Sequence, residues 1–306
     1  MKTLIICLTF LIFSVSNYAY SLENKILFKI NNKIITSLDI YDETQILKLL
    51  NKNISDLDNT EVIKIASNSK KNQTFKEVEL LKYNNNLDVP QEYLNSYLTN
   101  YSKKIGFNNI NEFKKYCKDH SIDFKTIKKK IIVEILWSRL IYEKFFSNVK
   151  VNEQNIRNEI LKNEFINEYL LLEIIFNVEN KNNLDLKFNA IKKSIENIGF
   201  EKSAFTYSIA STSENGGNLG WIKETALSSN IKKILKKTGV TNYTNPIQIP
   251  GGFLIFYIKD IKKTKSNLDI DEEIKNVIKS QTNKQLNQFS NMYLNRIKKN
   301  LEIDEF

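Results

Sequence analysis

The sequence predicts an α+β fold that consists of a mainly helical module and one smaller domain with a small antiparallel sheet. Three observations lead to this prediction. Between residues 38 and 162 the apolar residues follow helical spacing without strand-like alternation. Residues 166–263 combine strand-like runs with a glycine-rich loop and a short helical stretch. Residues 264–306 return to helical spacing before a short strand-like tail.

Length and charge narrow the class of protein. A chain of 306 residues is long enough for two modest domains, each with its own core. The net charge of +10 comes from lysines scattered among 35 acidic residues, not from one arginine-rich stripe. Surfaces that bind nucleic acids instead cluster Lys and Arg on one face. We therefore expect a solvated basic surface and no nucleic-acid partner.

The N-terminus has the pattern of a secretory signal peptide. Lys2 precedes an apolar run from Leu4 to Val15, and Ala19-Tyr20-Ser21 follows like a cleavage site. At ~1.5 Å per residue such a run covers about 18 Å, less than the ~30 Å hydrocarbon core of a bilayer. We predict a signal peptide at residues 1–21, cleaved near Leu22, and no stable membrane insertion. An uncleaved membrane anchor is the alternative.

Cysteine and histidine are too scarce for a metal or nucleophile site. Cys7 lies in the predicted signal peptide, which leaves Cys117 without a partner for a disulfide. His120 is the only histidine. Zinc sites and cysteine nucleophiles need further ligands or an activating base. We therefore expect neither a metal nor a cofactor.

The first elements of the mature chain read as a hairpin followed by helices. Lys25–Ile30 is strand-like, Asn31-Asn32 forms the turn, and Ile34-Ile35 begins the return strand. Thr36 with Asp39 three residues later is typical of a capping box at a helix start. Further helices are predicted at residues 38–50, 60–83, 91–105, 111–120, 124–146 and 153–162. The second of these is unusually polar from Ser67 to Gln73.

The stretch from Phe200 to Ile261 resembles the parvulin family of peptidyl-prolyl isomerases. Its most specific part is the loop from Gly216 to Trp221, which reads Gly-Gly-Asn-Leu-Gly-Trp. A Tyr207-Ser208 pair precedes this loop, and a helical stretch and the strand Gly252-Phe253-Leu254-Ile255 follow it. The resemblance implies a parvulin-type (PpiC) domain at residues 166–263, with Tyr169–Phe176 as its first strand.

A second resemblance covers nearly all of the mature chain. The segment from Phe28 to Ile40 is similar to the opening strand, turn and helix of SurA-like periplasmic chaperones. This resemblance implies a helical chaperone module at residues 22–165. It further implies that residues 264–306 form a helix and a strand that pack back on that module. Use of the helix as a dimer contact is the alternative.

The polar positions that the parvulin pattern uses for catalysis are all substituted. The family pattern has two histidines, a Cys or Asp, and a Ser or Thr around an apolar proline pocket. Aligned with that pattern, the corresponding positions carry Glu173, Ala210, Gly251 and Leu254. No catalytic residue is therefore assigned. The apolar residues that correspond to the proline pocket are retained as Leu219, Leu227, Ile231 and Phe253.

The two resemblances imply a periplasmic folding chaperone that binds unfolded outer-membrane or envelope proteins. Its parvulin-like domain is expected to hold extended peptide without isomerase activity. Two alternatives remain open: an active peptidyl-prolyl isomerase with an altered site, and a membrane-anchored envelope protein.

Overall fold

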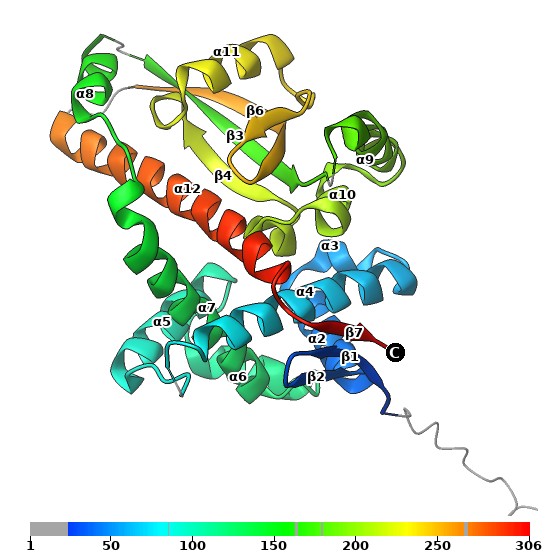
Figure 1. Cartoon of the computed structure of the whole chain (residues 1–306). Helices are drawn as coiled ribbons and strands as arrows, with labels where there is room; N and C mark the ends of the chain where they lie inside the picture. Colours follow the sequence, from blue (N-terminus) through cyan, green and yellow to red (C-terminus); the bar gives the residue numbers. More distant parts are fainter. Residues whose placement is uncertain (1–23, 85, 163–164, 179, 266–268) are drawn as a thin grey trace, which may run out of the picture.

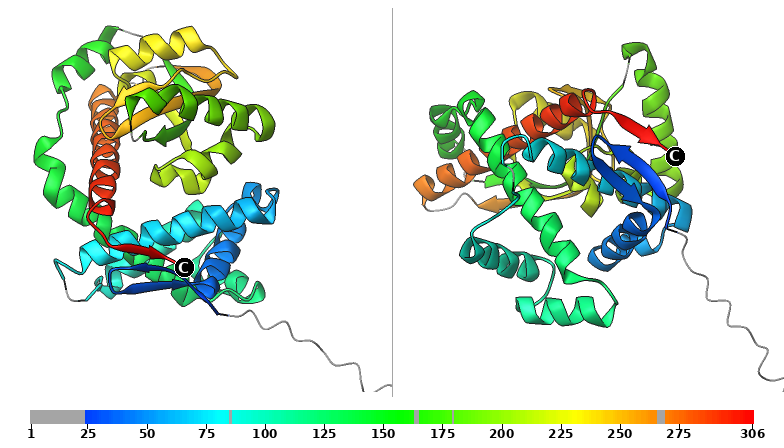
Figure 2. Two further views of the ribbon diagram at one scale, coloured as in Figure 1. Left: turned by 45° about the vertical axis from the view of Figure 1, so that its right-hand side comes forward. Right: turned by 60° about the horizontal axis from the view of Figure 1, so that its bottom comes forward.

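The computed structural model describes residues 24–306, except residues 85, 163–164, 179 and 266–268. The predicted signal peptide at residues 1–21 lies outside the described residues. The described chain has two parts, which we call the helical module and the sheet domain, and one long helix runs along both (Figures 1 and 2). The predicted α+β class, a mainly helical module with a small antiparallel sheet, is confirmed.

The N-terminal hairpin is built as its sequence predicts. β1 (Ile26–Ile30) pairs with β2 (Lys33–Thr36), and α2 (Ser37–Leu50) follows directly. Thr36 caps α2, since its hydroxyl accepts the Asp39 N–H at 3.3 Å and its own N–H donates to the Asp39 carboxylate at 2.9 Å. This capping box fixes the angle at which the hairpin enters the helix.

The rest of the helical module is a set of packed helices. They are α3 (Lys52–Ser55), α4 (Asn59–Leu80), α5 (Gln91–Lys104), α6 (Ile110–Asp119), α7 (Phe124–Phe145) and α8 (Glu153–Lys162). α7 joins two cores, because Val133 and Trp137 pack towards α4 while Ile127 and Ile131 pack towards α5 and α6. The buried, free Cys117 belongs to the second core, and burial raises its thiol pKa to about 11.

The sheet domain is a four-stranded antiparallel sheet with helices on both faces. Its strands are β3 (Phe165–Phe176), β4 (Asn218–Lys223), β5 (Ile247–Ile249) and β6 (Gly252–Lys265), in the order β4-β3-β6-β5. α9 (Leu184–Ile198) and α10 (Phe200–Tyr207) cover one face, and α11 (Ser229–Thr238) packs on the other. Short 3-10 turns at Ser211–Asn215 (η3) and Glu224–Ala226 (η4) flank β4.

The long helix α12 (Ile270–Lys298) connects the two parts. Near its start, Ile274 and Val277 share a small core with α8 and η4. Near its end, Tyr293 and Leu294 enter the core of the helical module, where Tyr293 stacks on Trp137 at a centroid distance of 5.6 Å. The chain then forms β7 (Ile303–Glu305), which pairs with β1 beside the N-terminal hairpin (Figure 1).

None of the helices within the described residues is both long and apolar enough to cross a membrane. The most apolar long helix, α7, carries lysines along its first turns. Its apolar residues pack into two cores of the helical module.

Candidate functional site

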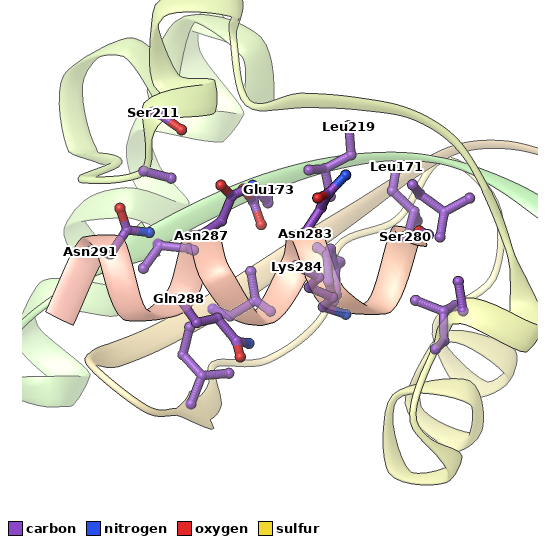
Figure 3. A pocket seen from close by; sticks show the side chains of 18 residues that line it. Leu171, Glu173, Ser211, Leu219, Ser280, Asn283, Lys284, Asn287, Gln288 and Asn291 are labelled. Atoms are coloured by element: carbon purple, nitrogen blue, oxygen red, sulfur yellow. The ribbon is translucent and has the colours of Figure 1, made fainter. Parts of the chain in front are cut away.

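A cavity of about 260 Å³ lies between one face of the sheet and α12 (Figure 3). Its floor consists of alternate residues of β3 and β6, because side chains of a strand point to opposite faces in turn. Leu171, Glu173 and Ile175 of β3 contribute to it, next to Leu254 and Phe256 of β6. The floor is therefore aliphatic and aromatic around a single carboxylate.

The walls are apolar and the roof is polar. Residues from η3, η4, β4 and β5, or directly next to these elements, form the walls: Ala210, Ser211, Leu219, Ile222, Ala226, Leu227 and Ile249. The roof is one face of α12, where side chains three, four and seven residues apart line up. The roof residues are Ser280, Asn283, Lys284, Asn287, Gln288 and Asn291. Figure 3 shows this row of hydroxyl, amide and ammonium groups along the helix beside Glu173.

The predicted pocket residues divide into two groups. Leu219 and Leu227 line the cavity. Ile231 is buried in the core under α11 and does not reach the lining. Phe253 lies on the other face of the sheet, where its ring stacks on Phe176 at a centroid distance of 5.8 Å. One residue along β6 decides this placement, since Leu254 faces the cavity and Phe253 faces α9.

The four substituted positions lie at or beside the cavity. Glu173, Ala210 and Leu254 belong to its lining, although they come from three separate elements. Gly251 follows in the turn before β6 and sits against α12. A Cβ atom at Gly251 would lie 2.7 Å from Cγ of Met292. Three of the four positions that the sequence predicts to be substituted are thus gathered around largely apolar side chains.

Glu173 is the only carboxylate among the residues that line the cavity. The hydroxyl of Thr212 donates a hydrogen bond to it at 2.9 Å. Burial raises the pKa of Glu173, and the Thr212 hydrogen bond and the charge of Lys284 oppose this shift only in part. The backbone around Glu173 is fixed as well, because its N–H donates to the Gly217 carbonyl at 2.8 Å.

Lys284 brings a cation to the roof. Its ammonium lies 5.6 Å from the centroid of the Phe256 ring. Burial lowers the pKa of Lys284, and the charge of Glu173 counteracts that shift. Within the part of the chain that the structure describes, this ammonium has neither a hydrogen-bond partner nor an ion-pair partner.

A charged contact fixes the sheet domain on the helical module. Lys130 of α7 pairs with Glu43 of α2 at 2.7 Å and with Glu214 of η3 at 3.2 Å. The Ser69 hydroxyl contacts the same two carboxylates at 2.6 and 3.0 Å. Phe205 of α10 adds an apolar contact, because its side chain packs into the core of the helical module. These contacts therefore hold η3, which forms part of the cavity wall, against the helical module.

The sequence reading missed the roof of the cavity. The sequence predicts that the helix in residues 264–306 packs back on the N-terminal module or forms a dimer contact, and it gives the polar face of that helix no role beside the sheet. A signal was present in the sequence, since Asn283, Asn287 and Asn291 recur every four residues. Such a ladder places amides on one helix face, but nothing in the sequence tells which surface that face meets.

Three comparisons relate this chain to known proteins. Residues 174–260 match the family model described as "Rotamase: PPIC-type PPIASE domain". The chain is 23% identical over 199 residues to Chaperone SurA of Pseudomonas putida, which covers 60% of this chain and 45% of that protein. It is 26% identical over 176 residues to Chaperone SurA of Hahella chejuensis, which covers 54% of this chain and 40% of that protein. The chain thus spans less than half the length of these relatives.

Solved structures give related matches. A SurA-like chaperone of Campylobacter jejuni is matched over 92% of this chain and 99% of that chain, with 14% identity and a TM-score of 0.35. A PpiC-type peptidyl-prolyl cis-trans isomerase domain is matched over 33% of this chain and 95% of that chain, with 30% identity and a TM-score of 0.28.

Proposed function

We propose that this chain, which contains a PpiC-type rotamase domain and has SurA chaperones among its homologues, is a periplasmic folding chaperone. Its clients are unfolded outer-membrane or envelope proteins. The PpiC-type domain holds client peptide and does not catalyse prolyl isomerisation. The periplasmic location rests on the predicted signal peptide and on the resemblance to SurA-like proteins.

One observation carries the proposal for the PpiC-type domain. Three positions that the parvulin pattern fills with catalytic polar groups line one cavity, and they carry Glu173, Ala210 and Leu254. Rotation about a prolyl peptide bond has a barrier of ~20 kcal/mol, so catalysis needs groups that stabilise the twisted amide. The only histidine, His120, ends α6 in the helical module, where its ring contacts Tyr116 at 4.1 Å between centroids. It supplies nothing to the cavity.

Exposed aromatic side chains on the helical module support client binding. Tyr93 and Tyr97 are one helical turn apart on α5, and they are 56% and 38% exposed. Tyr142 of α7 and Phe146, the residue directly after that helix, are also exposed, and their rings stack at 4.4 Å between centroids. Exposed aromatic groups of this kind provide large contact areas for apolar segments of an unfolded chain.

The test is suppression of aggregation. The purified protein is expected to slow the aggregation of an unfolded outer-membrane β-barrel protein at a near-equimolar ratio. A double variant, Tyr93→Ser with Tyr97→Ser, should need several-fold more protein for the same effect. The control is Lys103→Ser with Lys104→Ser, which makes an equal number of exposed changes on the same helix. Failure of the wild-type protein to slow aggregation contradicts the proposal.

A second candidate function is isomerisation with an altered site. The observation in its favour is Glu173, a carboxyl whose raised pKa and apolar surroundings are typical of acid and base groups in active sites. In that case catalysed turnover of a proline peptide would occur, and Glu173→Gln would abolish it.

A further inference from the structure

The cavity contains two opposite charges that are not paired with each other. Glu173 on the floor accepts one hydrogen bond, from Thr212. Lys284 on the roof has no polar partner among the described residues. Both face a lining that is otherwise aliphatic, aromatic or amide-bearing. The Lys284 ammonium faces the cavity without an acceptor among the described residues, so a ligand in the cavity can supply a charge-assisted hydrogen bond there.

The two charges lie on opposite sides of a narrow space. Glu173 and Phe256 are directly opposed residues of β3 and β6, and they face the same side of the sheet. The Lys284 ammonium lies 5.6 Å above the ring of Phe256. The donor on the roof and the acceptor on the floor therefore face each other across the cavity. A ligand group between them needs an acceptor on one edge and a donor on the opposite edge, as the C=O and N–H of a trans peptide unit have.

We propose that Glu173 and Lys284 together bind one main-chain peptide unit of the client, and that they thereby select peptide bonds which are not prolyl. The client carbonyl accepts from the Lys284 ammonium, and the client N–H donates to the Glu173 carboxylate. The adjoining aliphatic side chain contacts Leu219 and Leu254. This inference rests on the proposed function, because it names what the PpiC-type domain recognises in a client.

The selectivity follows from the chemistry of proline. A peptide bond that precedes proline has no N–H. In this cavity the carbonyl of such a bond would still accept from Lys284. The Glu173 carboxylate would receive no hydrogen bond from the client and would keep only the one from Thr212. A hydrogen bond to a charged group contributes enough that its loss weakens binding by at least about tenfold. The site in a rotamase-type domain would thus disfavour the residue that rotamases act on.

The size of the cavity fits a short segment of main chain. Its volume of about 260 Å³ lies just below the ~300–1,000 Å³ of ordinary small-molecule pockets. This space suits one peptide unit with one or two side chains. Recognition of the main chain also suits a chaperone, since the peptide unit is common to every client sequence.

The experiment compares three fluorescein-labelled nonapeptides that differ at one bond. Their central dipeptide is Leu-Ala, Leu-(N-methyl)Ala or Leu-Pro, and binding to the full chain is followed by fluorescence anisotropy. Binding is measured across a range of pH, because burial raises the pKa of Glu173 and lowers that of Lys284. The Leu-Ala peptide should bind at least about tenfold more tightly than the other two. N-methylalanine removes the N–H without the proline ring, which separates hydrogen bonding from shape.

Variants of the two charged residues test whether Lys284 and Glu173 cause the difference in affinity. Lys284→Met should weaken binding of the Leu-Ala peptide by about tenfold, because it removes the charged donor to the client carbonyl. Glu173→Gln should reduce the difference in affinity between the Leu-Ala peptide and the N-methyl peptide. The control is Lys279→Met, an exposed change on the same helix. It should alter neither the affinity for the Leu-Ala peptide nor its difference from the N-methyl peptide.

The outcomes separate this inference from the proposed function. Equal binding of all three peptides, or unchanged affinity in Lys284→Met, overturns the inference. If the same preparation still suppresses aggregation, the chaperone proposal stands without it. Loss of aggregation suppression in the wild-type protein overturns both.

Discussion

At the scale of single residues, Gly217 determines how the loop before β4 meets the sheet. Its φ of +76° lies in the left-handed region, and a Cβ atom there would be 2.2 Å from the Glu173 carbonyl oxygen. Only glycine satisfies both conditions. The close approach places the main chain of η3 against β3, and so it brings Ala210 and Thr212 beside Glu173.

Substitution of Gly217 by alanine should therefore be far more harmful than the same change at Gly220. We expect Gly217→Ala to cost about 3 kcal/mol or more, because the loop must move in addition to the backbone strain. Gly220→Ala is the matched control, since its φ is +72° but nothing lies within 4 Å of a Cβ atom. It should cost about 1 kcal/mol. Denaturant unfolding measures both, and equal losses would refute this account of Gly217.

Part of the site could be predicted at this scale and part could not. The period of two along β3 and β6 is enough to place Glu173 and Leu254 on one face once the strands are paired. The same rule puts Phe253 on the opposite face, and only the register of β6 against β3 reveals which of the two neighbours lines the cavity. Ile231 was predicted from its apolar character, which does not distinguish a core position from a lining position.

At the scale of elements, the start of α12 is fixed to β4 by a charged pair. Lys223 donates to Glu273 at 2.5 Å, and the Glu273 side chain is fully buried while that of Lys223 is 32% exposed. This contact and the apolar residues Ile274 and Val277 keep the roof of the cavity in place.

The two partners of this pair should respond differently to substitution. Lys223→Met leaves a buried carboxylate without its counter-ion and should cost about 3–5 kcal/mol. Glu273→Gln removes the buried charge, while Lys223 can reach water, so it should cost about 1 kcal/mol. Denaturant unfolding of both variants measures the two losses in free energy of unfolding. A larger loss for Glu273→Gln than for Lys223→Met would contradict the expected order.

The polar middle of α4 shows why helix content was easier to predict than packing. Ser69 and Gln73 fall in the stretch that weakened the apolar pattern, yet both are buried. Ser69 bonds Glu43 of α2, and Gln73 bonds Glu77 one turn on. Polar residues that are buried because a side chain satisfies them add nothing to the apolar pattern of the helix. Helices with an apolar stripe, such as α7, were predicted within a residue or two.

At the scale of the whole molecule, the contact between the two parts depends on ionised Glu214. Burial alone would raise its pKa, but Lys130, Lys76 and the Ser69 hydroxyl hold it below the ordinary value. A carboxyl with a lowered pKa in the folded state contributes stability above its ordinary pKa near 4.5. That contribution is lost as the pH falls through the lower, folded value.

Acid should therefore weaken the attachment of the sheet domain. Because the Glu214 side chain is 45% exposed, its contribution at about pH 6 is expected to be no more than about 1 kcal/mol. The difference in melting temperature between wild type and Glu214→Gln should shrink as the pH falls below the ordinary pKa of 4.5. Glu196→Gln, at an exposed pair 4.0 Å from Lys192, is the control. A difference that persists unchanged in acid would show that Glu214 acts without its charge.

The overall architecture was accessible from sequence because its signals are local. The Thr36 capping box, the strand patterns and the loop at Gly216 each report on a few neighbouring residues. The return of α12 and β7 to the N-terminal hairpin was implied only by the resemblance to SurA-like proteins. The position of α12 over the cavity depends on residues that are distant in sequence, since Lys284 lies above the ring of Phe256 and the charge of Glu173 acts on Lys284.

The most direct test of the central claim is the rate of prolyl isomerisation in a proline peptide, measured with the same preparation that suppresses aggregation. We expect a rate equal to the uncatalysed one, because Glu173, Ala210 and Leu254 stand where the parvulin resemblance implies catalytic polar groups. Catalysed turnover that survives further purification and disappears in Glu173→Gln would contradict it, and would identify the cavity as an active site with a new arrangement of groups.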